Sequence, residues 1–285
     1  MASTSTALDW LRDHSAVRAH FKGLDIEKRL KESGFVRITH FLPDAVATMA
    51  SAMLAKHDSW EVMHDGEVAE RSDSVMHRFH FAEPEDHPST IGILADAVAL
   101  LFEGLVPSFS VASYSRGDGI GPHDDKAHLE IDPVGGGRTV LHSRKIAGIL
   151  YLSKGWKAKF GGALIDLQGL AEHVPSFNSF VAFTVPRMHA VGPILTDSRP
   201  RLSMFGWWLE PGRLYELDGD ETAVEYADVP EDVGHVNVPP KAAQSVWRGR
   251  RRSEGGTQQH QQRIQKQIQK KQQTSQAVQK TRRGH

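Results

Sequence analysis

The sequence of 285 residues contains no cysteine, which excludes disulfide bonds, zinc–thiolate sites, iron–sulfur clusters and cysteine nucleophiles. It also lacks an apolar run long enough to cross a bilayer. The first residues have neither the basic segment nor the apolar stretch of a signal peptide. We therefore expect a cytoplasmic protein with no membrane contact, in which 16 histidines are the main supply of metal ligands.

Charge is divided unevenly along the chain, although the net charge is only −1. Residues 241–285 hold 12 Lys and Arg, 12 Gln and a single acid, Glu254. The preceding residues hold 22 basic and 34 acidic side chains, a net charge of −12. We interpret residues 213–240 as an acidic extension and residues 241–285 as a basic, glutamine-rich tail, which we expect to be disordered because it lacks core-forming residues.

The basic tail is open to three interpretations. Arg248 and Arg250–Arg252 are suited to bind phosphates of a nucleic acid without sequence selectivity. The same residues could form a nuclear-import signal, which would place the protein in the nucleus. A solubilising tail folded back on the acidic body also accounts for these charges. The first interpretation leads to a non-enzymatic alternative, a jelly-roll scaffold that binds nucleic acid or an acidic partner.

Residues 1–107 are predicted to form a helical support region. Helical patterns cover 15–32, which ends at Gly34, then Pro43 to about Ala55, and 91–106. Phe35–Ile38 alternates as a short strand does. Residues 61–90 are polar and predict a long loop or an irregular hairpin that can cover a pocket.

Residues 108–212 have the residue pattern of a β core. Short runs of β-type residues are separated by Gly, Pro, Asn and Asp, at 110–114, 147–152, 163–167, 180–183 and 201–209. This spacing favours an antiparallel sandwich or barrel over alternating βα units. Because the helices precede the strands, we expect a mainly β fold with flanking helices (α+β), in which helices pack on one face of the β core.

The segment Gly121-Pro122-His123-Asp124-Asp125 is the central chemical signal. In an extended chain, His123 and Asp125 lie two apart and project to the same face. His189 is the best candidate for a third ligand. Two histidines and one carboxylate form the facial triad of non-heme iron(II) oxygenases, which leaves positions open for a 2-oxo acid and for O2. A His-x-Asp tripeptide alone also arises as an ordinary surface pair, so the interpretation depends on the residues that follow.

The strand predicted from Arg201 supplies a second site. Arg201, Ser203, Phe205 and Trp207 share one face of this strand. A buried guanidinium needs an anionic partner and can bind a carboxylate bidentately. Ser203 beside it, Trp207 as a wall and the Tyr151 phenol as a donor would complete a socket for the distal carboxylate of 2-oxoglutarate. The alternatives are a surface ion pair for Arg201 and core packing for the aromatic residues.

The order of these motifs resembles the catalytic domain of the prolyl hydroxylases, within the 2-oxoglutarate- and iron(II)-dependent oxygenase superfamily. The resemblance covers about residues 110–210 and is weaker from about residue 30. It rests on Tyr114-x-x-Gly117-Asp118, His123-Asp124-Asp125, Ile149–Leu152 with Trp156, Gly161–Leu164, Asn178, His189–Val191 and Arg201–Trp207.

The resemblance implies a double-stranded β-helix, or jelly roll, supported by N-terminal helices. It also implies that the chain is a dioxygenase that hydroxylates a substrate while converting 2-oxoglutarate to succinate and CO2. Its cofactors would be iron(II), 2-oxoglutarate and O2, with ascorbate in addition. The implied roles are metal ligation by His123, Asp125 and His189, 2-oxoglutarate binding by Arg201 and Tyr151, a pocket wall from Tyr114, and close packing at Gly161-Gly162.

Two features leave alternatives open at the 2-oxoglutarate site. Arg201 follows His189 by twelve positions, which predicts a long turn at 193–200. Arg199 has the same parity as Arg201 and is the competing anion binder. The six-residue spacing from Arg201 to Trp207 favours Arg201, because it fits the family.

The substrate is the least determined part of the prediction. The resemblance implies a prolyl residue in a protein substrate. A free amino acid or small metabolite is the alternative, bound in a small closed pocket with Arg78, His80 or Lys126. Asp125 favours hydroxylation over halogenation, because related halogenases carry a small residue in place of this carboxylate.

Overall fold

The computed structural model describes residues 4–64, 77–82, 91–131 and 138–217. The basic tail 241–285, most of the acidic extension 213–240 and the middle of the polar segment 61–90 lie outside these residues, so the predictions for them remain predictions. Within the described part, no helix is both long enough and apolar enough to span a membrane.

Five α-helices occur in the described residues: α1 (Thr4–Arg12), α2 (His14–Leu24), α3 (Ile26–Ser33), α4 (Asp44–Lys56) and α5 (Ile91–Ala99). A short 3-10 helix covers Ala158–Phe160. The helical pattern predicted at 15–32 is confirmed, but it is divided between α2 and α3, because the chain turns at Asp25, whose φ of 52° is left-handed. Asp13 caps the N-terminus of α2, where its carboxylate accepts hydrogen bonds from the backbone N–H groups of Ser15 and Ala16. Gly34 ends α3 with a φ of 67°, as predicted.

The helix predicted at 91–106 is also too long. α5 ends at Ala99, residues 100–105 form turns, and the first long strand already begins at Val106. α4 agrees with the prediction from Pro43, and α1 was not predicted. The predicted strand at 35–38 is confirmed as β1 (Phe35–Thr39).

The described strands form one antiparallel sheet with the order β1-β10-β7-β12-β4-β3-β5-β11-β8-β9. β2 pairs with β3, which confirms a hairpin in the polar segment, and β6 pairs with β7. The remaining bounds are β2 (Glu61–His64), β3 (His77–Ala82), β4 (Val106–Tyr114), β5 (Gly119–His123), β6 (His128–Ile131), β7 (Val140–Tyr151), β8 (Leu164–Asp166), β9 (Ala171–His173), β10 (Ser179–Thr184), β11 (His189–Val191) and β12 (Arg201–Pro211).

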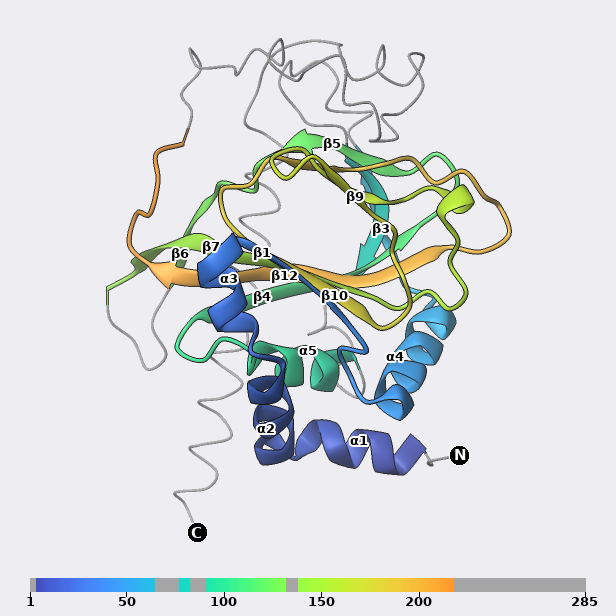
Figure 1. Cartoon of the computed structure of the whole chain (residues 1–285), viewed down its shortest axis with the longest axis horizontal. Coiled ribbons are helices and arrows are strands. Elements are labelled where there is room, and N and C mark those ends of the chain that lie inside the picture. Colours follow the sequence, from blue (N-terminus) through green and yellow to red (C-terminus); the bar gives the residue numbers. More distant parts are fainter. Residues whose placement is uncertain (1–3, 65–76, 83–90, 132–137, 218–285) are drawn as a thin grey trace.

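The sheet folds over itself into two layers. Figure 1 shows β5 and β9 above the layer that contains β1, β10, β12 and β4, while α1, α2, α4 and α5 lie on the other side of that lower layer. This is the expected double-stranded β-helix with helices on one face. β5, β6, β9 and β11 were not among the predicted strands. Each has five residues or fewer, too short for a recognisable alternation.

β12 separates the two sides of the lower layer. Leu202, Met204 and Trp208 pack against the helices, in a cluster that includes residues of α1 to α5. Trp207 and Leu209 point to the opposite side, between the layers. The predicted alternation of this strand is therefore confirmed, and it leaves one face of β12 for the interior of the jelly roll.

Candidate metal centre and anion pocket

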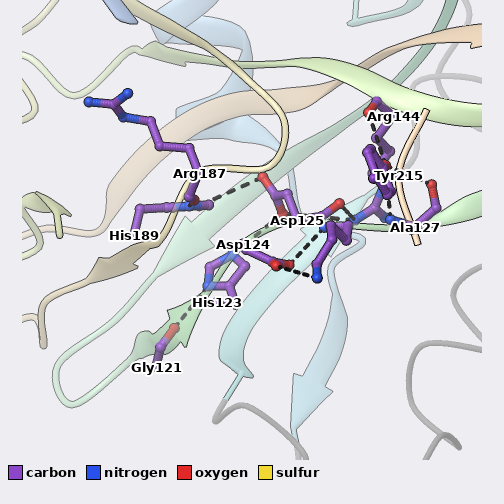
Figure 2. A network of polar contacts seen from close by, with 10 residues as sticks. Gly121, His123, Asp124, Asp125, Ala127, Arg144, Arg187, His189 and Tyr215 are labelled. Atoms are coloured by element: carbon purple, nitrogen blue, oxygen red, sulfur yellow. Dashed lines mark hydrogen bonds and ion pairs between the residues drawn. The ribbon is translucent and has the colours of Figure 1, made fainter. Parts of the chain in front are cut away.

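The three predicted metal ligands come together at one end of the jelly roll. β11 pairs with β5 in a register that sets His189 opposite His123. The Asp125 carboxylate lies 3.5 Å from Nε2 of His123 and 3.7 Å from Nε2 of His189. One ligand atom from each residue lies within 4.8 Å of the others. Figure 2 shows the three side chains converging from β5, from the turn that follows β5 and from β11.

Asp125 reaches this cluster by a route that the sequence did not indicate. β5 ends at His123, so His123 and Asp125 do not share one face of a strand. Asp125 has a φ of 65°, a left-handed conformation that is uncommon for any residue other than glycine. The predicted proximity is correct, but the turn after β5 produces it.

Both histidines are oriented by backbone carbonyl groups. Nδ1 of His123 lies 2.8 Å from the carbonyl oxygen of Gly121, and Nδ1 of His189 lies 2.7 Å from that of Arg187. A carbonyl oxygen only accepts, so each Nδ1 carries the proton and donates it. Each Nε2 then faces the Asp125 carboxylate and is the nitrogen that a metal would bind.

The electrostatics of the cluster favour a bound cation. Burial and the neighbouring His123 lower the pKa of His189 to about 4, so this imidazole is neutral at pH 7. Burial alone would lower the pKa of His123, but the hydrogen bond to Asp125, the charge of Asp125 and the hydrogen bond to Gly121 together outweigh burial and raise the pKa. Burial alone would raise the pKa of Asp125, but His189, His123 and Arg144 hold it far below its ordinary range. A neutral imidazole beside an ionised carboxylate suits a divalent metal.

Arg144 is a neighbour of the cluster that the sequence analysis missed. Its Nη1 lies 3.8 Å from Oδ1 of Asp125 and donates to the Asp125 carbonyl oxygen at 3.4 Å. The guanidinium carbon lies 3.5 Å from the centre of the Trp207 ring. Its Nε is buried without a hydrogen-bond partner. Arg144 belongs to the first half of β7, which precedes the predicted run 147–152, so no pattern pointed to it.

Arg201 lies in a second part of the interior, as the alternation predicted. Its side chain is buried, with its guanidinium carbon 4.5 Å from the Tyr114 ring centre and 5.0 Å from the Tyr151 ring centre. Nε of Arg201 and the hydroxyl of Tyr151 are buried and have no hydrogen-bond partner. A buried polar group without a hydrogen-bond partner lowers stability by about 1–3 kcal/mol, and a charged group lowers it by more. A carboxylate between them would accept from both.

The two tyrosines at Arg201 are neutral donors. Burial raises the pKa of Tyr114 to about 12, although Arg201 opposes the rise. Burial also raises the pKa of Tyr151, again against Arg201. Both phenols therefore keep their protons at pH 7 beside the charged guanidinium of Arg201.

The rest of the predicted socket lies on the same wall. Ser203 and Trp207 are buried on the Arg201 side of β12, and Ser203 is aligned with Tyr151 of β7. Gly162, with a φ of 70°, packs so closely that a Cβ atom would collide with Ile194 and lie 3.0 Å from Cδ of Arg201. A Cβ on Gly161 would collide with the carbonyl oxygen of Pro193. The close packing expected at this glycine pair is present.

Arg199 does not reach the pocket. Its side chain is exposed, and its Nη1 donates to the carbonyl oxygen of Lys154 at 2.9 Å. Lys126, which was considered for a small closed pocket, pairs instead with Asp124 at 3.3 Å. The side chains of Arg78 and His80 lie outside the described residues, so that alternative pocket is not described.

A buried ion pair holds the strand that carries His189. Arg187 donates from Nε and Nη2 to the two carboxylate oxygens of Asp166, at 2.9 and 2.7 Å. The backbone N–H of Arg187 donates to the carbonyl oxygen of Asp124 at 3.2 Å, and its carbonyl oxygen accepts from His189. Arg187 therefore connects the two chain segments that supply the cluster.

Replacing Asp166 by Asn tests this connection. Asp166→Asn leaves the Arg187 guanidinium buried without its counter-charge, and we expect the free energy of unfolding to fall by about 3–5 kcal/mol. The measurement is urea unfolding of the full-length chain, followed by tryptophan fluorescence.

The matched control is Asp197→Asn, which breaks the ion pair between Asp197 and Arg116. Both side chains are exposed, Asp197 at 70% and Arg116 at 63%. This change should cost at most about 1 kcal/mol. Equal losses in the two variants would show that the buried pair does not stabilise this region.

Comparison with known proteins identifies relatives of this region. Residues 109–209 match the family described as the 2OG-Fe(II) oxygenase superfamily. Prolyl 3-hydroxylase OGFOD1 of Mus musculus is 33% identical over 114 residues, which are 36% of this chain and 18% of the relative. The Xenopus laevis protein of the same name is 33% identical over 111 residues, 35% of this chain and 19% of its own. The chain thus spans about a fifth of these curated relatives.

Solved structures with a similar arrangement include a prolyl-4-hydroxylase of Pseudomonas putida, at 23% identity and a TM-score of 0.45. That similarity covers 69% of this chain and 100% of the other. A Trichoplax adhaerens prolyl hydroxylase, in complex with a peptide of a hypoxia inducible factor oxygen degradation domain, is 17% identical with a TM-score of 0.46. Here 73% of this chain and 94% of the other are covered.

Proposed function

We propose that this chain is an iron(II)- and 2-oxoglutarate-dependent oxygenase that hydroxylates a prolyl residue in a protein. The match of residues 109–209 to the 2OG-Fe(II) oxygenase superfamily supports the class of reaction. We propose in addition that His123, Asp125 and His189 hold the metal. Arg201 and Tyr151 hold the distal carboxylate of 2-oxoglutarate, beside Tyr114, Ser203 and Trp207. The donor set of two imidazole nitrogens and one carboxylate supports the first assignment.

When bound, iron(II) and 2-oxoglutarate supply the oxidation by O2, which releases succinate and CO2 and leaves a hydroxylated product. The protein contributes orientation and charge. The carbonyl groups of Gly121 and Arg187 accept from Nδ1 of the two histidines, so that Nε2 of each ring is the nitrogen that faces Asp125. Asp125 supplies the negative charge that compensates a divalent cation in a buried position.

One observation carries the cosubstrate assignment: Nε of Arg201 and the hydroxyl of Tyr151 are both buried without a partner. The Arg201 guanidinium lies over the rings of Tyr114 and Tyr151, and Ser203 is aligned with Tyr151. A structural arginine at this position would be paired with an acid of the chain. If Arg201 instead binds the carboxylate of a ligand, its neighbours must not neutralise its charge. The neutral phenols of Tyr114 and Tyr151 meet this requirement.

The choice of a prolyl substrate rests on the relatives, which carry the name prolyl 3-hydroxylase. Arg144 is compatible with a peptide, because its unpartnered Nε beside the metal centre can donate to a main-chain carbonyl oxygen. A free amino acid would offer its carboxylate to the same guanidinium. Hydroxylation of a free amino acid or small metabolite is therefore the second candidate.

The cosubstrate assignment predicts different results for two neighbouring arginines. Arg201→Lys removes a bidentate, charge-assisted contact, and we expect the 2-oxoglutarate concentration for half-maximal succinate formation to rise about tenfold to a hundredfold. Arg199→Lys is the matched control and should leave that concentration unchanged, because Arg199 is exposed and bonded to Lys154. A rise in the Arg199 variant alone would identify Arg199 as the anion binder.

The substrate proposal predicts which compounds stimulate turnover. We expect succinate formation by the full-length chain to increase with proline-containing peptides, and mass spectrometry to find one added oxygen on proline. The matched peptides have each proline replaced by alanine and should give no increase above the substrate-free rate. Stimulation by free amino acids alone, or equally by the proline-free peptides, would contradict the proposal.

A further inference from the structure

A short segment after β12 returns along the edge of the jelly roll toward the metal centre. This C-terminal strap, residues 212–215, is held by β7. The N–H of Gly212 donates to the carbonyl oxygen of Leu141 at 2.7 Å. The hydroxyl of Ser143 donates to the Gly212 carbonyl oxygen at 2.7 Å and accepts from the N–H of Leu214 at 3.1 Å. The strap therefore follows a fixed path to Tyr215.

Tyr215 ends the strap with its ring and hydroxyl both engaged. Its ring stacks on the ring of His128, with centres 5.2 Å apart and planes 16° from parallel. Nε2 of His128 lies 3.1 Å from the Tyr215 carbonyl oxygen. The ring also packs against the apolar cluster between the layers. These contacts fix the direction in which the hydroxyl points.

The hydroxyl of Tyr215 holds the peptide group of Ala127. It accepts from the Ala127 N–H at 3.2 Å and lies 3.0 Å from the Ala127 carbonyl oxygen and 2.9 Å from that of Arg144. A phenol has one proton, so it donates to one of these two oxygens at a time. The Arg144 N–H also donates to the Ala127 carbonyl oxygen, at 3.2 Å. Figure 2 shows Tyr215 and Arg144 meeting at Ala127.

Ala127 is the last residue of the turn that presents Asp125. At its start, the Asp124 carbonyl oxygen accepts from Arg187, and the Asp124 carboxylate accepts from the N–H of Lys126. At its end, Tyr215 and Arg144 hold Ala127. Between the two, Asp125 has its left-handed φ of 65°. Such a conformation persists only where its surroundings determine it.

We propose that Tyr215 is a positioning residue of the metal centre, whose hydroxyl fixes the turn that directs the Asp125 carboxylate at His123 and His189. This inference rests on the proposed ligand assignment. Tyr215 lies outside the residues 109–209 that match the superfamily, so the strap adds a support from this chain's own C-terminal side. Tyr215 touches neither the metal cluster nor the anion pocket and acts through Ala127.

The alternative is that Tyr215 only packs, and Tyr215→Phe separates the two roles. The phenylalanine keeps the ring against His128 and the apolar cluster, but it leaves the Ala127 N–H without its acceptor. Packing alone predicts no change at the metal centre. Positioning predicts a weaker and altered metal site in a protein that remains folded.

The experiment titrates cobalt(II) into the metal-free, full-length chain and follows the visible absorption of the bound ion. For Tyr215→Phe we expect the Kd for cobalt(II) to rise about threefold to tenfold, as the loss of one hydrogen bond implies, together with a changed band shape. Leu214→Ala is the matched control on the strap. Its side chain is 44% exposed, and the substitution should leave Kd and spectrum unchanged.

A Kd for Tyr215→Phe within twofold of the wild-type value, with an unchanged spectrum, would overturn the inference. Asp125→Ala in the same titration separates this failure from failure of the ligand assignment. If Asp125→Ala also binds cobalt(II) normally, the assignment is wrong. If Asp125→Ala loses binding and Tyr215→Phe does not, only the positioning role is wrong.

Ser143→Ala provides a second variant should Tyr215→Phe fail to fold. It removes the hydroxyl that holds Gly212 and Leu214 and leaves Tyr215 intact. The positioning role predicts a higher cobalt(II) Kd for this variant as well, because a loosened strap no longer fixes the phenol. An unchanged Kd in folded Ser143→Ala, beside an unfolded Tyr215→Phe, would assign Tyr215 to packing.

Discussion

The antiparallel pairing of β5 with β11 is the constraint on which the site depends. It sets His189 opposite His123, and the turn after β5 then places the carboxylate of Asp125 close to both rings. Buried imidazoles beside a buried carboxylate are costly to hold without a proton or a cation among them. The surroundings meet this cost with fixed donors and acceptors. Backbone carbonyls orient both rings, Arg187 joins the two segments, and Tyr215 with Arg144 closes the turn.

The two faces of β12 explain how the same fold supports chemistry and stability. One face places Leu202, Met204 and Trp208 against the helices and forms the largest apolar cluster of the described residues. The other face presents Arg201 and Trp207 to the interior, where each meets a side chain of β4 or β7. The helices thus cover one face of β12, and its other face carries the anion pocket. Closely packed glycines beside Arg201 leave its side chain little freedom.

Much of this architecture could be predicted where a residue pattern is long. The alternation of β12 identified the buried face of Arg201, and the helical period of α4 was sufficient for its bounds. Short strands could not be predicted in this way, because three residues of β11 carry no period. Asp125 was found for a partly wrong reason, since a left-handed turn and not strand parity brings it to His123. Arg144, Asp166 and Tyr215 escaped notice because their roles come from strand pairing and packing between distant segments, which a single sequence does not display.

The central claim is that His123, Asp125 and His189 bind a metal that also receives 2-oxoglutarate. Its most direct test is the anaerobic addition of iron(II) and then 2-oxoglutarate to the metal-free protein, followed by visible absorption spectroscopy. Chelation of iron(II) by a 2-oxo acid produces a charge-transfer band, which reports both ligands at one site. We expect the band in the wild-type chain and its loss in His189→Ala. A band of full intensity in that variant, or no band in the folded wild-type protein, would contradict the account.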